Sequence, residues 1–437
     1  MEIETIDATT GYAGFFADDQ RAIKRGAKRD GFVYEGEPVT DGFEAIRQAG
    51  EALLVDVELA DGTVGRGDCA AVQYSGAGGR DPLFRAEEYA PVVTGPVADA
   101  LRGSDARGFL ENAEAIEHLR IDGEKLHTAI RYGVSQALLA AAARAEGTTR
   151  TDVLADALET EPASDPVPVF GQSGDDRYAN AEKMIVKGVP VLPHALINSA
   201  EKLGPDGEGL LEYVAWLAER ALELGSEGYE PRFHVDVYGT IGDLFGPPYD
   251  RAEVVDYFYA IEEAAAPFSI QIEGPMDAGS RETQIEAMAE LRDGLRDAGV
   301  DVPIVADEWC NTLADVQAFV DAGAADLVQV KTPDLGGIHR SGRAVRYCEG
   351  TDTEAYLGGT CNETATSARA CAHVALATDA AQTLAKPGMG FDEGYMLVEN
   401  EMRRTIARRE RAAERTSTDA ETGAGSDSES GEVSADD

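Results

Sequence analysis

Four ionisable residues stand at comparable positions in the second half of the chain, each directly after a short apolar run. They are Asp236 in HVDVYG, Glu273 in IQIEG, Asp307 in IVADEW and Lys331 in LVQVKTP. The three acids lie 37 and 34 residues apart. Carboxylates gathered at one place repel one another unless a cation lies among them, and oxygen ligands with room for water suit Mg²⁺. The pattern therefore indicates a magnesium site with a lysine beside it.

Each acid taken alone has a simpler interpretation, because acidic residues often begin loops or cap helices in an acid-rich chain. Lys331 is harder to explain in this way, since only 8 of the 38 basic residues are lysines. A desolvated lysine near a dication has a lowered pKa and can act as a neutral base. Such a base could take a proton next to a metal-bound carboxylate, and the metal would stabilise the resulting enediolate.

The residues between these positions predict strands that alternate with helices. From about residue 166, strand-like segments recur between amphipathic patterns, and they are VPVFGQ, MIVKGVPVLPHA, RFHVDVYG, FSIQIEG, PIVADEW, DLVQVKTP and AYLGGTC. Helices are predicted over 208–225, 250–263, 280–298 and 312–322. So many βα units in succession favour a βα barrel, although an open parallel sheet also fits.

In a βα barrel, the carboxyl ends of the strands direct side chains into one pocket. Residues two apart share a strand face, so Gln329 lies on the same side as Lys331. His194 follows an earlier strand and could approach the opposite face of a reacting carbon. The strand-end candidates are Gln172, His194, Asp236, Glu273, Asp307, Lys331, Thr360 and Cys361.

The beginning of the chain is organised differently. A β-hairpin is predicted over 52–72, with its turn at Asp61-Gly62. Three prolines in LETEPASDPVPV mark a linker before the barrel. We therefore expect an α+β capping domain at 1–160, a barrel domain with a C-terminal helix at 161–411, and a disordered acidic tail at 412–437.

The formal net charge is −43, from 81 acidic and 38 basic residues. The tail holds 8 acids and 1 base, so the remainder still has a charge of −36. Such self-repulsion is tolerated where salt screens it, and the scarcity of lysine agrees, so we expect the salt-rich cytoplasm of an extreme halophile. No basic cluster in the sequence is dense enough to predict nucleic-acid binding.

Membrane and secretion signals are also missing from the sequence. No apolar run reaches the roughly 18–20 residues of a membrane helix, and the N-terminus has no signal-peptide pattern. The five cysteines include no CxxC, which argues against a disulfide framework and a structural zinc site. We expect a cytoplasmic protein with neither membrane nor nucleic-acid partners.

The motifs around the candidate residues resemble the enolase superfamily and, within it, the methylaspartate ammonia-lyase family. The similar segments are HVDVYGTIG, IEGPMD, ADEWCNT, QVKTPDLGGIH and GGTCNETATSAR in the barrel and AAVQYSGAGGRDPLF in the cap. Many superfamily members have Lys-x-Lys on one strand. This chain has Gln329 and Lys331 there, with His194 earlier, as in the methylaspartase arrangement. The resemblance implies an enolase-like fold, with an N-terminal α+β cap on a modified TIM (βα) barrel.

The resemblance also implies a reaction, the reversible elimination of ammonia from (2S,3S)-3-methylaspartate to give mesaconate. It assigns Mg²⁺ to Asp236, Glu273 and Asp307. Lys331 would remove the C3 proton, and His194 would lie on the other face of the substrate. The implied substrate-binding residues are Gln73 from the cap and Gln172, Gln329, Thr360 and Cys361 from the barrel. K⁺ is the implied monovalent activator, and a homodimer is the implied assembly.

Two alternatives stay open. One is another Mg²⁺-dependent enzyme of the same fold that removes an α-proton, such as an acid-sugar dehydratase or a cycloisomerase. Gln329 in place of a second lysine argues against a dipeptide epimerase. The other is a non-catalytic, acidic interaction protein built on a barrel, although such a scaffold has no need for charges inside the barrel mouth.

Overall fold

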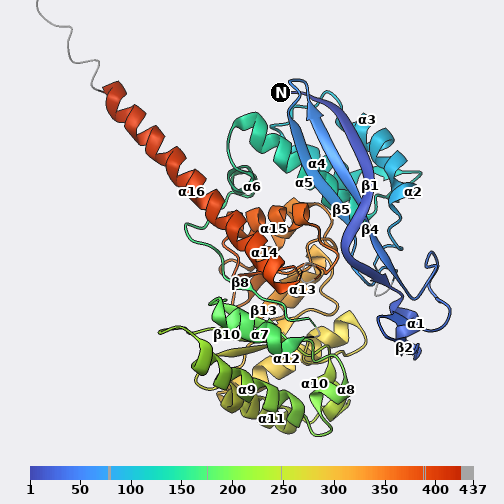
Figure 1. Cartoon of the computed structure of the whole chain (residues 1–437), viewed down its shortest axis with the longest axis vertical. Helices are drawn as coiled ribbons and strands as arrows, with labels where there is room; N and C mark the ends of the chain where they lie inside the picture. Colours follow the sequence, from blue (N-terminus) through green and yellow to red (C-terminus); the bar gives the residue numbers. More distant parts are fainter. Residues whose placement is uncertain (77–79, 175, 248, 387, 389, 425–437) are drawn as a thin grey trace, which may run out of the picture.

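The computed structural model describes residues 1–76, 80–174, 176–247, 249–386, 388 and 390–424. The first part of the chain forms a cap that lies against one side of a βα barrel (Figure 1). The barrel is closed, and its eight strands follow the order β10-β11-β12-β13-β14-β15-β8-β9 with every neighbouring pair parallel. This confirms the predicted barrel and rules out the open sheet.

The barrel strands are short. They are β8 (Val169–Phe170), β9 (Val191–His194), β10 (Arg232–Asp236), β11 (Ile270–Glu273), β12 (Ile304–Ala306), β13 (Leu327–Val330), β14 (Glu354–Leu357) and β15 (Gln382–Leu384). The first seven lie in segments that the sequence predicted as strands. The eighth, β15, was not predicted, because three residues are too few to show a periodic pattern.

Helices cover the outside of the barrel. They are α7 (Arg177–Val186), α8 (Ala200–Leu203), α9 (Glu208–Leu224), α10 (Thr240–Phe245), α11 (Arg251–Ala265), α12 (Arg281–Ala298), α13 (Leu313–Asp321), α14 (Ile338–Cys348), α15 (Ala365–Thr378) and α16 (Phe391–Ala424). The four predicted helices correspond to α9, α11, α12 and α13. Side-chain caps set three of their starts, since Asp250 accepts from Ala252 N, Ser280 accepts from Thr283 N, and Thr312 forms a capping box with Asp315.

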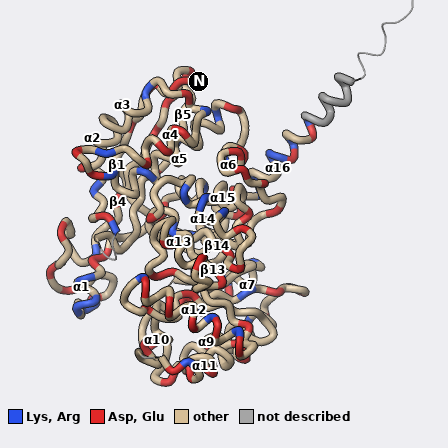
Figure 2. The backbone as a smooth tube through the Cα atoms, turned by 180° about the vertical axis from the view of Figure 1, so that it is seen from behind, with Lys and Arg blue, Asp and Glu red and all other residues tan. Residues whose placement is uncertain are grey.

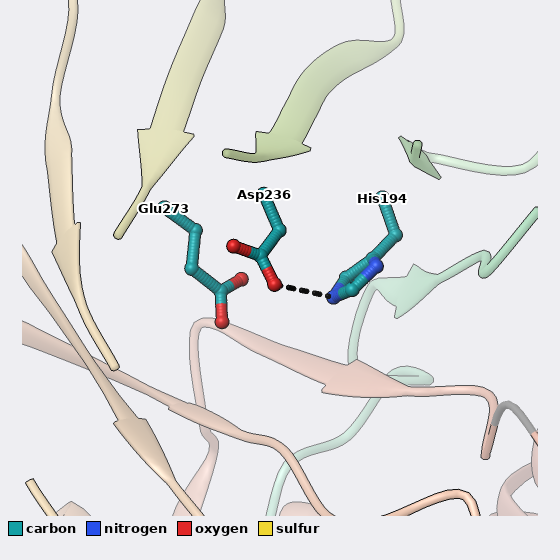
Figure 3. Close-up of side chains that lie close together, drawn as sticks. All are labelled: His194, Asp236 and Glu273. Atoms are coloured by element: carbon teal, nitrogen blue, oxygen red, sulfur yellow. Dashed lines mark ion pairs between the residues drawn. The ribbon is translucent and has the colours of Figure 1, made fainter. Parts of the chain in front are cut away.

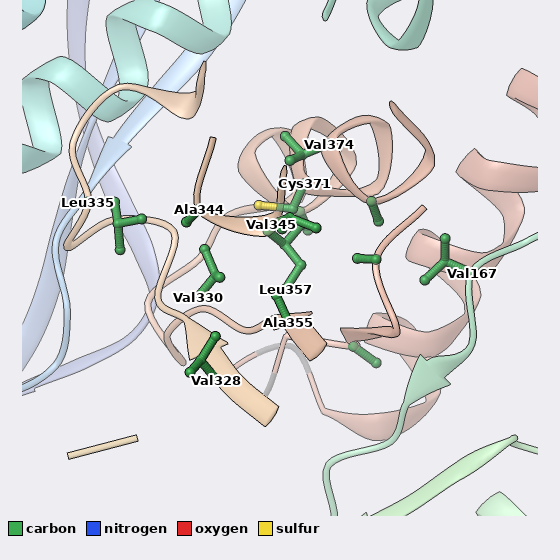
Figure 4. Packing of buried hydrophobic residues seen from close by; sticks show 14 of the residues in the cluster. Val167, Val328, Val330, Leu335, Ala344, Val345, Ala355, Leu357, Cys371 and Val374 are labelled. Carbon is green, nitrogen blue, oxygen red and sulfur yellow. The ribbon is translucent and has the colours of Figure 1, made fainter. Parts of the chain in front are cut away.

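The strands alternate between the barrel interior and the helical layer. Val328 and Val330 on β13 pack outward in the large apolar core, near Val345 of α14 and Val374 of α15 (Figure 4). Leu327, one residue before, belongs to a separate apolar cluster inside the barrel. This alternation directs the polar side chains at the strand ends into the mouth.

The cap combines an antiparallel sheet with helices. The sheet has the order β1-β4-β5, with β1 (Ile3–Asp18), β4 (Arg47–Leu59) and β5 (Val64–Ala70). β4 and β5 form the predicted hairpin. The remaining elements are α1 (Gln20–Lys24), β2 (Arg29–Asp30), β3 (Val33–Tyr34), α2 (Ala86–Val92), a π-helical turn (Val93–Val97), α3 (Ala98–Leu101), α4 (Phe109–His118), β6 (Arg120–Ile121), β7 (Glu124–Lys125), α5 (Thr128–Glu146) and α6 (Arg150–Leu158).

Helix α5 joins the cap to the barrel, because it packs on β5 and also contacts α14 and α15. Two glycines on β5 permit this close approach. A Cβ at Gly65 would lie 2.3 Å from the Ala137 carbonyl oxygen, and a Cβ at Gly67 would lie 2.2 Å from that of Gly133. Nearly all of α5 between Ala129 and Ala143 is buried as a result.

The C-terminal helix is longer than the sequence predicted. α16 continues past Arg411 to Ala424, so the first part of the predicted disordered tail is helical. Ala412, Ala413 and Glu414 are strong helix formers and extend the helix before polar residues take over. In Figure 1 this helix projects away from the barrel. Residues 425–437 lie outside the described part, and their disorder stays a prediction.

Two exclusions from the sequence can be compared with the structure. Across the described residues, no helix has both the length and the low charge of a membrane span. Cys69, Cys310, Cys348, Cys361 and Cys371 are all free, as expected for a chain without a disulfide framework.

Candidate active site

The predicted metal ligands lie at the ends of neighbouring strands. Asp236 is the last residue of β10 and pairs in register with Glu273, the last residue of β11. Asp307 directly follows β12, and Lys331 directly follows β13. All three carboxylates are buried. Because the strands are parallel, their carboxyl ends meet at one mouth of the barrel, as the sequence predicted.

The structure places His194 against two of these acids. One ligand atom each from His194, Asp236 and Glu273 lies within 4.8 Å of the others. Figure 3 shows the three side chains converging, with His194 Nε2 3.6 Å from Asp236 Oδ2. Asp307 instead forms an ion pair with the ammonium group of Lys331. The geometric cluster therefore shares Asp236 and Glu273 with the predicted ligand set and has His194 in the third place.

The acids at the mouth have more negative charge than the structure compensates. Burial, and then the charge of Asp307, raises the pKa of Glu273 to about 7. Burial and the charges of Glu273 and Asp307 raise the pKa of Asp236 well above its usual value. Among the described residues, Glu273 Oε2 and Asp307 Oδ1 accept no hydrogen bond. Asp307 Oδ1 instead pairs with the Lys331 ammonium, and Glu273 Oε2 lies beside the His234 ring. Buried, crowded carboxylates of this kind are a donor set that fits Mg²⁺.

Glu273 is held in place from inside the barrel. Its Oε1 accepts hydrogen bonds from Gln329 Nε2 and, at 2.7 Å, from the Tyr356 hydroxyl. His234 Nε2 lies 2.8 Å from Glu273 Oε2, without hydrogen-bond geometry, and the imidazole stacks on Phe170 with ring centroids 4.0 Å apart. These contacts orient one carboxylate while leaving an oxygen available for a ligand.

The pKa of Lys331 differs from the sequence-based expectation. Burial lowers it, but the charges of Asp307 and Glu308 outweigh both burial and the nearby Arg80, so the net direction is upward. The expected lowering assumed a dication beside the amine. The carboxylates of Asp307 and Glu308 by themselves stabilise the ammonium form.

His194 and Lys331 face each other across the barrel mouth. His194 ends β9 and Lys331 follows β13, and in the closed order these strands are four positions apart in either direction. His194 has a left-handed backbone, with φ +63°. Burial lowers the pKa of its imidazole to about 4, so the ring is neutral near pH 7. A ligand between them would meet a lysine on one side and a neutral histidine on the other.

Gln73 brings the cap into contact with the barrel mouth. It follows β5, and its Nε2 donates to Asp18 Oδ2 at 2.7 Å. The Cys361 thiol donates to Gln73 Oε1 at 3.0 Å. Burial raises the pKa of this thiol to about 12, so it stays protonated. A predicted cap residue and a predicted barrel residue are thus in direct contact.

The other predicted substrate-binding residues are buried at or near the mouth. Gln172 Oε1 accepts from Gly174 N at 2.6 Å, which leaves its amide nitrogen for another acceptor. Thr360 lies in the loop after β14. Gln329 directs its nitrogen to Glu273, and its Oε1 has no hydrogen-bond partner among the described residues.

A cleft of about 210 Å³ lies beside these residues, between the cap and the loop after β12. Its lining is Gln20, Lys24, Arg80, Asp277, Glu308, Trp309 and Asn311. Arg80 crosses the gap, donating to Asp334 Oδ2 at 2.8 Å and to Asn311 Oδ1 at 2.9 Å. The cap therefore contacts the barrel close to Asp307.

Sequence reasoning did not single out Arg80, Tyr356 or Lys386. Tyr356 lies in an apolar strand and gives no signal beyond a buried aromatic residue. Lys386 could have been found, because QTLAK repeats the pattern of LVQVK, a short apolar run that ends in one of the few lysines.

Comparison with known proteins agrees with this geometry. Two family models match, "Methylaspartate ammonia-lyase N-terminus" over residues 1–159 and "Methylaspartate ammonia-lyase C-terminus" over residues 161–411. The chain is 70% identical to a methylaspartate ammonia-lyase of the halophile Haloarcula marismortui, over 95% of this chain and 99% of that protein. It is 53% identical to the Citrobacter amalonaticus protein, over 93% and 98%.

Solved structures show the same relationship. A magnesium complex of β-methylaspartase from Clostridium tetanomorphum superposes with a TM-score of 0.91 at 51% identity, over 94% of this chain and all of that one. The structure of the Citrobacter amalonaticus enzyme containing (2S,3S)-3-methylaspartic acid superposes with a TM-score of 0.91 at 53% identity, and the match covers 94% of this chain and 100% of that one. Muconate lactonizing enzyme from Pseudomonas putida shares the fold alone, with a TM-score of 0.56 at 18% identity over 86% of this chain and 85% of that one. The chain has an enolase-like fold and belongs to the methylaspartate ammonia-lyase family of carbon–nitrogen lyases.

Proposed function

We propose that the chain catalyses the reversible, Mg²⁺-dependent elimination of ammonia from (2S,3S)-3-methylaspartate to mesaconate, by way of an enediolate. The observation that supports this most directly is the placement of Lys331 and His194 on opposite sides of a mouth lined by buried carboxylates. The similar proteins of known structure support the choice of substrate and metal, since one is a magnesium complex and another contains this amino acid.

Asp236, Glu273 and Asp307 are the proposed Mg²⁺ ligands. Their crowded negative charges raise the pKa of Asp236 and Glu273, and oxygen ligands of this kind favour a hard dication. When bound, Mg²⁺ supplies charge stabilisation to the substrate carboxylate as the neighbouring proton leaves. His194 then stays free of the metal and faces the substrate.

Lys331 takes the C3 proton onto Nζ in this proposal. The amine must be neutral to accept it. Burial and Arg80 already lower its pKa, and only Asp307 and Glu308 oppose them. Asp307 in the role of a metal ligand no longer supports the ammonium form, which frees the amine to act as a base.

The electron pair left at C3 forms the C2–C3 double bond as the C2–N bond breaks and ammonia leaves. His194 lies on the opposite face, where its neutral ring is a second base for the epimeric substrate or a hydrogen-bonding group. The proposed contacts to the substrate carboxylates and amino group come from Gln73, Gln172, Gln329, Thr360 and Cys361.

The proposal also includes K⁺ as a monovalent activator, a homodimer and a cytoplasmic location, which rest on the family resemblance and on the acidic composition. The two alternatives from the sequence are less well supported. A dehydratase or cycloisomerase shares only the fold, and a non-catalytic protein does not agree with membership in a family of lyases.

The test is a direct assay in molar KCl with Mg²⁺, in which (2S,3S)-3-methylaspartate is added and mesaconate is followed by its ultraviolet absorbance. We expect absorbance to rise, to stop on chelation and to resume when Mg²⁺ is restored. The Lys331→Ala variant, checked for folding by circular dichroism, is the matched control. A folded wild-type protein that forms no mesaconate would contradict the proposal.

A further inference from the structure

A second concave site lies away from the barrel mouth, where α5, α6, α15 and α16 meet the edge of β5. Its volume is about 410 Å³, and none of the residues proposed for catalysis lines it. Six arginines line it, and together they define what is called here the arginine pocket: Arg66, Arg144, Arg150, Arg369, Arg404 and Arg408. Figure 2 shows basic positions along α16 and beside α15.

One carboxylate faces these six guanidinium groups. Glu401 is the single acidic residue among the residues that line the pocket. It lies 3.2 Å from Arg150 and 3.5 Å from both Arg369 and Arg404. Its pKa falls to about 2, because the His373 hydrogen bond and the arginine charges outweigh burial, which acts in the opposite direction. Glu401 is therefore already shared between several cations.

The other arginines have no carboxylate inside the pocket. Arg66 pairs at 3.4 Å with Asp56, which is outside the lining, and Arg408 donates to the Gly147 carbonyl oxygen at 3.1 Å. Arg144 forms no ion pair within the described part of the chain. With His373 neutral, six positive groups and one negative group leave the lining at +5.

This local excess is opposite to the charge of the whole molecule. The chain has 81 acidic residues and could have paired each of these arginines, yet the lining includes one acid. Like charges crowd instead. Burial lowers the pKa of Arg150, and the charges of Arg144 and Arg369 lower it further. An anion that enters between these positive groups offsets their mutual repulsion, so its binding is favourable.

The size and chemistry of the pocket limit the ligand. A volume of about 410 Å³ is far larger than one monatomic ion and falls within the range of small-molecule sites. Planar guanidinium groups match the oxygen pairs of phosphate and carboxylate. The lining includes no aromatic side chain other than the imidazole of His373, so a nucleobase has little surface on which to stack.

We propose that the arginine pocket binds a small oxyanion with two or more negative charges, either a phosphate group or a polycarboxylate. Such an anion would bridge Arg66 and Arg144 of the cap to Arg404 of α16. Binding would therefore stabilise the contact between the cap and the barrel domain. The site is independent of the proposed catalytic reaction.

The test is isothermal titration calorimetry on the full chain in molar KCl, at constant ionic strength, with inorganic phosphate, pyrophosphate, citrate and acetate as separate probes. We expect one site per chain for at least one multivalent anion, a higher thermal midpoint with that anion, and no site for acetate. Comparison of pyrophosphate with citrate distinguishes phosphate from polycarboxylate ligands.

Matched variants locate the site. Arg144→Gln with Arg404→Gln removes two exposed arginines of the pocket, and we expect binding to weaken by about tenfold or more. Arg403→Gln is the control, because Arg403 is on the same helix but pairs with Glu399 outside the lining. Equal responses to all four anions, or equal binding by both variants, would overturn the proposal. The proposal would also be overturned if no anion bound and the double variant dissociated into smaller assemblies. That result would show that acidic groups of a second copy of the chain occupy the pocket.

Discussion

Two lysines occupy equivalent places in the barrel and have opposite surroundings. Lys331 follows β13 and Lys386 lies just beyond β15, at the same end of the barrel. Each is largely buried and pairs with one acid, Lys331 with Asp307 and Lys386 with Glu363. Burial lowers the pKa of both amines, and neighbouring negative groups raise it above its usual value.

The region around Lys386 is fully satisfied. Both oxygens of Glu363 accept from the Tyr132 hydroxyl, at 3.0 and 2.9 Å, and one also accepts from the Thr332 hydroxyl at 2.6 Å. Lys386 Nζ lies 3.5 Å from Glu363 and donates to the Gly358 carbonyl oxygen at 2.7 Å. Tyr132 comes from the cap, so this cluster ties α5 to the loop that holds Thr360 and Cys361.

The region around Lys331 is left incomplete. Asp236, Glu273 and Glu308 add negative charge that a single lysine does not balance, and Glu273 Oε2 accepts no hydrogen bond from the described residues. A buried charged cluster with every group paired maintains structure, whereas one with unpaired groups is prepared for a ligand. The role of a strand-end lysine therefore depends on its acidic neighbours. Where their charges are fully paired the lysine is structural, and where they are not the lysine belongs to a ligand site.

The largest expected effect comes from removing the incomplete cluster's base. Lys331→Ala should lower kcat by about a thousandfold or more, because the proposed acceptor of the C3 proton is then missing. With Mg²⁺ present the thermal midpoint should change little, because the bound metal would compensate Asp307 in place of the Lys331 ammonium. Mesaconate formation and exchange of the C3 proton with solvent measure the effect. Proton exchange at the wild-type rate would show that Lys331 is not the base.

Removing Lys386 should affect stability more than activity, which is the reverse of the result expected for Lys331. Lys386→Met leaves Glu363 buried without its cation and should lower the free energy of unfolding by about 3–5 kcal/mol. Denaturant unfolding in molar KCl measures this loss. Adding Glu363→Gln should restore more than half of the lost stability, because the uncompensated charge is gone. A single variant as stable as wild type would contradict the assignment.

Metal binding should distinguish the two clusters again. Asp307→Asn should weaken the affinity for Mg²⁺ by about tenfold or more, because one charged ligand is lost. Glu363→Gln should bind Mg²⁺ as tightly as wild type, since Glu363 is already occupied by three protein groups. Calorimetric titration with Mg²⁺ compares the variants. Equal affinity of Asp307→Asn and wild type would remove Asp307 from the ligand set.

The smallest expected effect concerns the support of one ligand. Tyr356→Phe removes the hydroxyl that donates to Glu273 at 2.7 Å. The affinity for Mg²⁺ should fall severalfold, equivalent to about 1 kcal/mol for one hydrogen bond. The same titration applies. Tyr347→Phe is a matched control, because its hydroxyl donates to Asp321 on the surface. Similar losses in both variants would show a general effect of tyrosine removal.

Local patterns in the sequence were sufficient for the long elements. The caps at Ser280 and Thr312, together with helical periodicity, indicated α12 and α13, because capping and amphipathicity depend on residues a few positions apart. The same information failed for β15, where three residues form no pattern, and for the end of α16, where good helix formers continue past Arg411.

The sequence by itself determined the alternating βα units, the acidic surface and the acids and lysine at the strand ends, because strand alternation and composition are local properties, whereas closure of the sheet into a barrel was left open against an open sheet. Only the tertiary structure decided which groups meet. It placed His194 opposite Lys331 through closure of the barrel, and it gathered arginines from Arg66 to Arg408 into one pocket where the linear sequence shows no basic cluster. Such neighbours depend on long-range packing, which no short pattern along the chain specifies.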